Sequence, residues 1–310
     1  MSELIKKQNF GVEIEMTGIT RQEAAKVIAA HYNTNATYIG TYYQTYGATD
    51  TKGRTWKAMS DSSIRTEKKS GGSKVSAGDA YSCEVVTPIL QYEDMEDLQQ
   101  IIRELVKAGA LVNESCGIHV HVDGAKHTPE SLTRLLNFAT GRQDLFYEAL
   151  QIGARGDRWC RKIDKSLLNA MKHGGNQSRS AAERTWYSSV NSGYTGGINH
   201  EHYNSTRYHG INLHAFFTKG TVEFRLFNGT LHAGTIKAYV QFCLAMSAWA
   251  IECKNDNLFF KSIDHMTTEQ KGKLMERVLK NRLGLRGPEY KTCRLHLTAA
   301  FKTGSEETAA

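Results

Sequence analysis

Acidic and imidazole side chains alternate with apolar ones in three short stretches of this sequence, a spacing that could bring metal ligands together. The stretches are 10–16, 117–123 and 221–227. Side chains on a β-strand point alternately to opposite faces, so each stretch predicts one apolar face and one charged face. The charged faces would carry, stretch by stretch, Glu13 and Glu15; His119, His121 and Asp123; and Glu223, Arg225 and Phe227.

A sheet with one solvated side would be the simplest explanation, because such sheets are common in antiparallel folds. The residue types argue against it, since solvated strand positions usually hold threonine, lysine, serine or glutamine. Converging carboxylates repel one another and take up protons unless a cation balances their charge. Oxygen-rich ligation with one or two imidazoles suits Mg²⁺ or Mn²⁺ better than zinc. Glu84 can add a further carboxylate, and Arg225 could hold a phosphoryl oxygen beside a metal bound by Glu223.

The elements that must position these residues alternate between strands and helices. Apolar periodicity predicts strands at 10–16, 83–90, 117–122, 208–217 and 221–227, with one or two hairpin strands in 37–59 and a hairpin turn at 218–220. Helical spacing and capping residues predict helices at 21–31, 95–108, 128–150 and 233–253, and a last one from Thr267 to near Gly284. Two polar segments would lack regular structure, namely a mobile Gly-rich loop at 68–78 and an irregular basic insertion at 153–206 that we expect over the site.

Composition sets the broad class of the protein. The chain has 310 residues, of which 40% are apolar, and this is enough to bury a full core. We find no secretory signal or membrane-spanning stretch and expect a soluble cytoplasmic protein without a membrane partner. The six cysteines contain no C-x-x-C pair and are expected to be reduced thiols. A formal net charge of +7 would suit a polyanion or a phosphate-bearing ligand, but the chain lacks the basic blocks of a nucleic-acid-binding arm.

An ordered set of motifs resembles the amidoligase family, whose members are similar in fold to glutamine synthetase and glutamate–cysteine ligase. The matching runs are FGVEIEM (10–16), WKAMSDSSI (56–64), CEVVTPIL (83–90), GALVNESCGIHVHVD (109–123), RWC (158–160) and RYHGINLHAFFTKGTVEFRLFNGTL (207–231). The resemblance implies an α+β fold in which helices back a curved antiparallel sheet shaped as a half-funnel. It also implies a single catalytic domain over 1–303, followed by a tail at 304–310 that we expect to be disordered.

The resemblance further implies an ATP- and Mg²⁺- (or Mn²⁺-) dependent carboxylate–amine ligase that forms an amide bond through an acyl phosphate. Its implied metal ligands are Glu13, Glu15, Glu84, one of His119 or His121, and Glu223. Arg225 would stabilise the transferred phosphate, and Asp61 or Glu84 would take a proton from the amine. Arg207 would meet a phosphate or a substrate carboxylate. In one respect the chain departs from the family, because Ser62 stands where glycine usually follows the aspartate of the Ser-Asp motif.

The implied substrates are one carboxylate-bearing and one amine-bearing compound, for which amino acids, peptides and modified nucleobases all fit. Two other functional classes stay open. A metal-dependent hydrolase of amides or phosphoesters would use the same residue types, and it differs from a ligase in consuming no ATP. A non-catalytic polyanion-binding protein would use the positive charge, and its salt-sensitive binding would survive Glu13→Ala.

Overall fold

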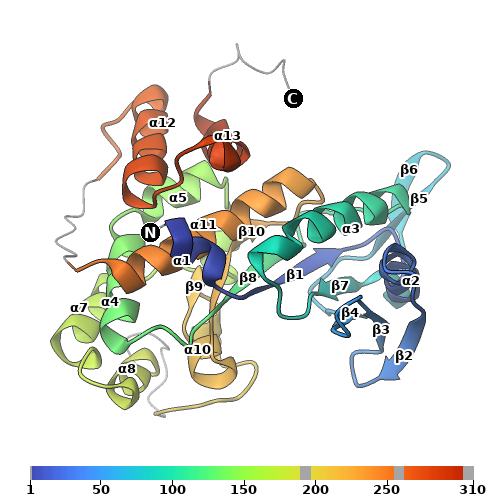
Figure 1. Ribbon diagram of the computed structural model, residues 1–310, viewed down its shortest axis with the longest axis horizontal. Coiled ribbons are helices and arrows are strands. Elements are labelled where there is room, and N and C mark those ends of the chain that lie inside the picture. The colour runs from blue at the N-terminus through green and yellow to red at the C-terminus, as the bar shows by residue number, and fades with distance from the viewer. Residues whose placement is uncertain (1, 189–196, 255–261, 303–310) are drawn as a thin grey trace. The chain divides into compact units, whose positions relative to one another are not determined.

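The computed structural model describes residues 2–188, 197–254 and 262–302, and the predicted tail at 304–310 lies outside these ranges. Eight strands form a sheet in the order β2-β3-β4-β7-β1-β8-β10-β9, and helices accompany it in a mixed α+β fold (Figure 1). The chain divides into two compact units, which are described separately below. Unit 1 comprises Met1–Gln8, His121–Leu226 and Gln241–Ala310, and unit 2 comprises Asn9–Val120 and Phe227–Val240.

Five strands of unit 2 pair in consecutive antiparallel ladders. They are β1 (Phe10–Met16), β2 (Ala36–Gly40), β3 (Thr45–Thr49), β4 (Thr55–Met59) and β7 (Cys83–Val86). The strand predicted at 10–16 is confirmed, whereas 37–59 holds three strands instead of one or two. The strand predicted at 83–90 ends at Val86, close to Pro88, which has no N–H to give to a ladder. A single bridge between Phe10 and Leu90 continues the pairing beyond it.

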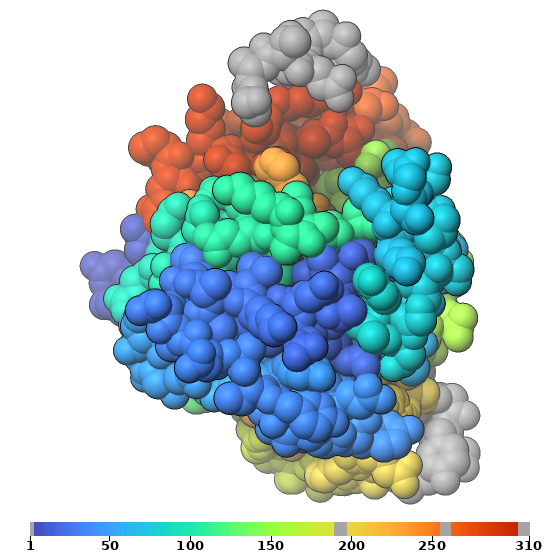
Figure 2. Space-filling model, turned by 90° about the vertical axis from the view of Figure 1, so that its right-hand side faces the viewer, coloured from blue at the N-terminus to red at the C-terminus, as the bar shows by residue number. Residues whose placement is uncertain are grey.

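Two helices of unit 2 pack against each other beside these strands, α2 (Arg21–His31) and α3 (Met95–Lys107). Both were predicted, and α2 begins at a capping box between Thr20 and Glu23. Figure 2 shows the outer side of this layer, with α3 in turquoise green next to the blue of α2. Because α2 packs on β2, β3, β4 and β7, the apolar strand residues such as Trp56 and Ala58 are fully buried on that side. The alternate residues of β1 and β7 point to the other face.

The segment predicted as a mobile loop at 68–78 is instead a hairpin, so that prediction is wrong. It consists of β5 (Glu67–Ser70) and β6 (Ser73–Ser76), and the turn residues Gly71 and Gly72 both have positive φ. Two left-handed residues match the twist of a tight hairpin, which explains why glycines occupy the turn. At its base the Glu67 backbone exchanges hydrogen bonds with the Thr17 hydroxyl, at 2.8 Å in each direction. The polar composition therefore reflects an exposed hairpin.

Aromatic side chains join three helices of unit 1, α4 (Pro129–Thr140), α5 (Gln143–Ala149) and α11 (Ala233–Glu252), the last of which begins in unit 2. Phe138 packs on Trp249 and Phe146 packs on Phe242. The continuous helix predicted over 128–150 is wrong, because it breaks at Gly141 and Arg142. Glycine is the weakest helix former after proline, and Arg142 leaves helical geometry with φ −138°. The predicted N-cap at Thr128 is confirmed.

The strand predicted at 208–217 is also wrong. Only β9 (Ile211–Asn212) is extended, and α10 (His214–Lys219) follows it. The Asn212 side chain accepts a hydrogen bond from the backbone N–H of His214 at 2.8 Å, which supports the start of the helix. Gly220, with φ +75°, ends α10 in place of the predicted hairpin turn at 218–220. The next strand, β10 (Thr221–Asn228), and β8 (Gly117–Asp123) are as predicted.

The remaining helices are short. The described part of the insertion at 153–206 is more regular than predicted, since it contains α6 (Arg155–Arg158), α7 (Lys165–Ala170) and α8 (Arg179–Trp186). At the C-terminal end α12 (Thr268–Arg277) starts at the predicted Thr267 capping box and continues as a π-helical turn, Val278–Arg282. The sequence reasoning missed α1 (Ser2–Lys7) and α13 (Lys291–Thr298). None of the six cysteines forms a disulfide, and no helix in the described ranges has both the length and the apolar character to cross a membrane.

Candidate functional site: an acidic cluster on three strands

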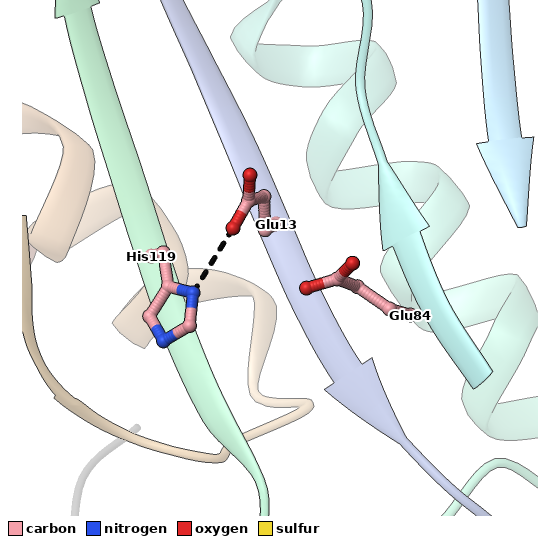
Figure 3. A group of neighbouring side chains, drawn as sticks. All are labelled: Glu13, Glu84 and His119. Carbon is pink, nitrogen blue, oxygen red and sulfur yellow. Dashed lines mark hydrogen bonds and ion pairs between the residues drawn. The ribbon is translucent and has the colours of Figure 1, made fainter. Parts of the chain in front are cut away.

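Four carboxylates and one imidazole gather on the strand face of unit 2 that α2 does not cover. We call this set the acidic cluster, and it consists of Glu13, Glu15, Asp61, Glu84 and His119. Figure 3 shows Glu13 on β1 lying between His119 of β8 and Glu84 of β7. All five residues were candidates from the sequence, and the structure brings them together.

The strand register explains why these side chains meet. Glu15 of β1 lies opposite Glu84 of β7, and residues that face each other in an antiparallel pair point to the same side. Glu13 is two residues from Glu15 and therefore shares its face. His119 Nδ1 lies 3.0 Å from Glu13 Oε2, and its Nε2 lies 3.8 Å from Glu15 Oε1. The alternation seen in the sequence is thus what assembles the cluster.

Burial separates this cluster from an ordinary solvated face. Glu15 and His119 are each 3% exposed, and Glu84 is 8% exposed. Charged strand residues that served only to solvate a sheet would be open to water. Burying several like charges costs free energy unless hydrogen bonds or a counter-ion compensate. The backbone N–H of Gly117 supplies one compensating bond, to Glu15 Oε2 at 2.6 Å.

The donor set fits a divalent cation. Ligand atoms of Glu13, Glu84 and His119 all lie within 4.8 Å of one another, and so do those of Glu15, Asp61 and Glu84. Glu84 belongs to both groups, so two overlapping cation positions could share one carboxylate. Four carboxylates and one imidazole form a hard, oxygen-rich set that suits Mg²⁺ or Mn²⁺. A cation would also neutralise the repulsion among the carboxylates.

Asp61 reaches the cluster from a loop whose backbone is fixed by two residues that sequence reasoning missed. The Ser82 hydroxyl accepts from the Asp61 N–H at 3.0 Å and donates to the Asp61 carbonyl at 2.6 Å. Behind it, buried Arg21 donates to the Ser82 carbonyl at 2.8 Å. The Asp61 carboxylate accepts from the Ser63 N–H, and Ser62 has no positive φ, so this turn does not need the family's usual glycine. An arginine in the first turn of α2 gave no sequence signal for this role.

The other predicted residues belong to unit 1, where Glu223 and Arg225 of β10 form a buried ion pair. Arg225 Nη1 lies 2.5 Å from Glu223 Oε1, and the side chains are 7% and 3% exposed respectively. Asn212 Nδ2 donates to Glu223 Oε2 at 2.7 Å, and Arg225 Nε donates to the Trp159 carbonyl at 3.4 Å. The insertion therefore touches Arg225 through the Arg158–Cys160 motif.

A small pocket of about 150 Å³ adjoins this ion pair within unit 1. Its lining includes Arg207, His214 and Glu223, and Arg207 is held by a bond from Nη1 to the His202 carbonyl at 2.8 Å. Burial lowers the pKa of His214 to about 4, with the positive charge of Arg207 acting in the same direction. His214 is therefore neutral at pH 7, and its Nδ1 lies 2.6 Å from the Tyr187 hydroxyl. The pocket thus combines the charged groups of Arg207, Lys219 and Glu223 with the neutral imidazole of His214.

His121, the second candidate histidine, is 9% exposed, and its Nδ1 lies 2.9 Å from the Thr221 hydroxyl in unit 1. One of its ring nitrogens lies within 4.8 Å of a Glu223 carboxylate oxygen. Both histidines of β8 are thus close to a carboxylate. That one of His119 or His121 is a metal ligand stays a prediction.

The sequence model of a family described as "Putative amidoligase enzyme" matches residues 6–247. The chain belongs to this family. No curated protein matches it closely. Membership in an amidoligase family indicates a ligase that forms amide bonds, from substrates that carry a carboxylate and an amine. The match contains all five residues of the acidic cluster, the Glu223–Arg225 pair and Arg207.

The amidoligase match ends before the C-terminal helices. Residues beyond 247 include the end of α11 together with α12, the π-helical turn and α13. These elements still contribute fully buried side chains, among them Leu279, Leu283 and Leu297. They are therefore part of the folded core of unit 1, although the family description does not extend to them.

Proposed function

We propose that this amidoligase joins a carboxylate to an amine with ATP and Mg²⁺ or Mn²⁺, through an acyl phosphate, on a half-funnel-shaped sheet. The observation that carries the proposal is the buried acidic cluster, in which two overlapping groups of cation ligands share Glu84. Family membership supports amide formation, and the cluster supports the handling of a cation-bound polyphosphate. Hard cations in such sites commonly bind carboxylates on one side and phosphate oxygens on the other.

The chemistry explains why phosphate is needed. A carboxylate is a poor electrophile, and an oxide or hydroxide is a poor leaving group at neutral pH. In the proposed reaction a carboxylate oxygen of the substrate bonds to the terminal phosphorus of ATP as the bond to ADP breaks. The amine nitrogen then attacks the acyl carbon, and phosphate leaves with the former carboxylate oxygen. The products are an amide, ADP and phosphate, with the amine protons passing to a base.

Cations bound here would neutralise negative charge on the phosphoryl oxygens. Glu13, Glu84 and His119 would hold one, and Glu15 and Glu84 would contribute to the other. The imidazole of His119 is oriented by the contact of its Nδ1 with Glu13 Oε2 at 3.0 Å. Metal-binding histidines are commonly held in this way by a carboxylate at the other ring nitrogen. The low exposure of Glu15 and Glu84 keeps their ligand oxygens at fixed positions. These residues act as cation ligands. Their replacement should therefore reduce the affinity for the cation while the fold is kept.

Arginines of unit 1 would bind the anionic groups. Arg225 is placed by its bonds to Glu223 and to the Trp159 carbonyl, and a planar guanidinium suits a phosphoryl oxygen. Arg207 lines the adjacent pocket and would bind a substrate carboxylate or a phosphate. In this arrangement Glu223 positions Arg225, and its role as a cation ligand stays a prediction. The ion pair and the catalytic roles are therefore compatible.

Asp61 would accept the proton from the ammonium form of the amine. Its side chain is half-buried at the edge of the acidic cluster, whereas Glu84 is shared by both ligand groups and is more deeply buried. A general base must reach the substrate nitrogen, which favours the loop residue over the strand residue. We therefore assign the base to Asp61 and the holding role to Glu84.

The test is release of ADP by the purified chain with Mg²⁺, ATP and pooled acids and amines. We expect ADP and an amide product in equal amounts, and a loss of at least about a hundredfold in rate for Glu84→Gln, because a shared ligand is removed. Glu96→Gln, at an exposed position of α3, is the matched control and should keep full activity. Product without nucleotide consumption would replace the ligase with a metal-dependent hydrolase.

A further inference from the structure

A second pocket, of about 400 Å³, lies in unit 1 among residues to which no role has been given above. We call it the arginine cleft, because Arg142, Arg277 and Arg282 line it. One wall is a single face of α12 and the π-helical turn, where Leu274, Arg277, Val278, Asn281 and Arg282 recur at helical spacing. The other wall is the break between α4 and α5. A pocket of this size can hold a small organic ligand.

The broken helix is what turns Arg142 toward the cleft. Its guanidinium stacks on Phe138 with 4.4 Å to the ring centre, and Nη1 contacts the Phe138 carbonyl at 3.4 Å. The opposite wall contains a π-helical turn, a feature that is rare and occurs frequently at functional sites. Each wall thus has an interruption of regular α-helix that carries an arginine of the cleft: the break between α4 and α5 carries Arg142, and the π-helical turn carries Arg282.

Positive charge in the cleft is not balanced by the protein residues that the structure describes. Asp144 also lines it, but its carboxylate binds Lys162 at 2.6 Å. None of the described carboxylates forms an ion pair with Arg142, Arg277 or Arg282. Burial lowers the pKa of Arg142 to about 10, and the charge of Arg282 acts in the same direction, so Arg142 remains charged at pH 7. Because Arg142 and Arg282 are both positively charged and line the same cleft, an anion bound there would be attracted to both.

Most of the remaining side chains in the lining are apolar. They belong to Leu145, Ile263, Leu274 and Val278, and Leu145 and Val278 are almost fully buried. A dianionic phosphate matches two guanidinium groups in charge and in planar hydrogen-bonding geometry. An apolar body on that phosphate would contact the leucine, isoleucine and valine side chains that line the cleft. Inorganic phosphate alone would make none of these apolar contacts.

We infer that the arginine cleft binds a phosphate monoester with a small apolar body. Much of its lining, from Ile263 to Arg282, lies beyond residue 247, where the amidoligase match ends. The cleft is therefore a feature of this chain that the family assignment does not explain. It contains no residue of the acidic cluster and none of the pocket beside Arg207. The ligand would be an effector or a distinct substrate group, recognised through its phosphate.

Calorimetric titration of the full chain with n-hexyl phosphate tests this inference. Methyl phosphate has the same head group without the apolar body, and it should bind at least about tenfold more weakly. Arg282→Gln and Arg142→Gln should each weaken hexyl phosphate binding about tenfold, because each removes a charged hydrogen-bond donor. Arg103→Gln, which removes the same charge at an exposed site on α3, should leave binding unchanged.

Arg282 is exposed, so its replacement should not prevent folding even if that of Arg142 does. The inference is overturned by an undetectable interaction with hexyl phosphate, by equal affinity for methyl phosphate, or by unchanged affinity in Arg282→Gln. The Glu84→Gln variant separates this site from the proposed ligase. It should bind hexyl phosphate as the unmodified chain does, whatever happens to ADP release.

Discussion

The acidic cluster of unit 2 and the Glu223–Arg225 pair of unit 1 bury charge in two different ways. In the cluster, four carboxylates gather with one imidazole, so like charges predominate. In the pair, each charge has an opposite partner at 2.5 Å, and Asn212 donates a further hydrogen bond to Glu223. Both are carried on strands, and their members Glu15, Glu84, Glu223 and Arg225 are all at most 8% exposed. For these four residues, therefore, the two arrangements differ in the signs of the charges that they bring together and not in depth.

That difference indicates what each arrangement is for. A balanced buried pair is self-sufficient, and removing one partner leaves the other charge in a poor environment. A group in which carboxylates predominate gains from a cation, so removing one member relieves repulsion among like charges while it weakens cation binding. The same substitution, glutamate to glutamine, should thus act in opposite directions at the two places.

The largest expected effect is the loss of stability in Glu223→Gln. Breaking a buried ion pair by removing one partner typically costs about 3–5 kcal/mol, because Arg225 would keep its charge without its carboxylate. Chemical denaturation of the metal-free protein would measure it. Glu269→Gln is the control, since its pair with Lys273 is exposed on both sides and should contribute under about 1 kcal/mol.

In the same experiment Glu84→Gln should leave the free energy of unfolding unchanged or raise it. A loss of several kcal/mol at Glu84 as well would contradict the comparison. The cluster would then be a network that the protein balances by itself.

How far the sequence predicts this site depends on the type of element. Alternation along a strand needs no information from elsewhere in the chain, so Glu13, Glu15 and His119 could be assigned to one face before the fold was known. Pairing register cannot be read from one strand, yet it decides that Glu84 faces Glu15. The positioning of Asp61 by Ser82 and Arg21 depends on loops distant in sequence, so local patterns could not reveal it.

Errors in the predicted fold have similar local causes. The apolar and aromatic residues at 208–217 favoured a strand, but a side-chain bond to Asn212 supports the start of a helix there. Thr128 was a strong start signal for α4, whereas the sequence reasoning gave too little weight to Gly141, a weak helix former at which α4 ends. The break matters, because it forms one wall of the arginine cleft.

A second prediction sharpens the comparison by adding the cation. A ligand that binds only the folded state stabilises it by about 2.7 kcal/mol at a concentration of 100 times its dissociation constant. We therefore expect Mg²⁺ or Mn²⁺ to raise the melting temperature of the unmodified chain, and to do so much less in Glu84→Gln. Glu96→Gln should respond as the unmodified chain does, because Glu96 is exposed on α3 and outside the cluster. An equal rise in all three proteins would indicate nonspecific binding and would remove the basis for the cation site.

The smallest expected effect concerns acid. Burial lowers the pKa of His127, His209 and His214 to about 4, and all three lie in unit 1. A histidine whose folded pKa lies below its unfolded value of 6.5 stabilises the fold fully above pH 6.5 and loses that contribution as the pH falls toward 4. Near pH 5 each fully buried histidine should cost on the order of 1–2 kcal/mol relative to pH 7.

His127 is the residue with which to test this slope, because its two ring nitrogens each lie 2.9 Å from a serine hydroxyl, those of Ser131 and Ser247. Replacing it with glutamine keeps hydrogen-bonding groups and removes the titration. His127→Gln should therefore lose less stability between pH 7 and pH 5 than the unmodified chain, whatever its stability at pH 7. His173→Gln, at an exposed position, should keep the original slope. If His127→Gln loses as much stability between pH 7 and pH 5 as the unmodified chain, protonation of His127 is not the cause of the loss. Protonation of the acidic cluster is then the first alternative to examine.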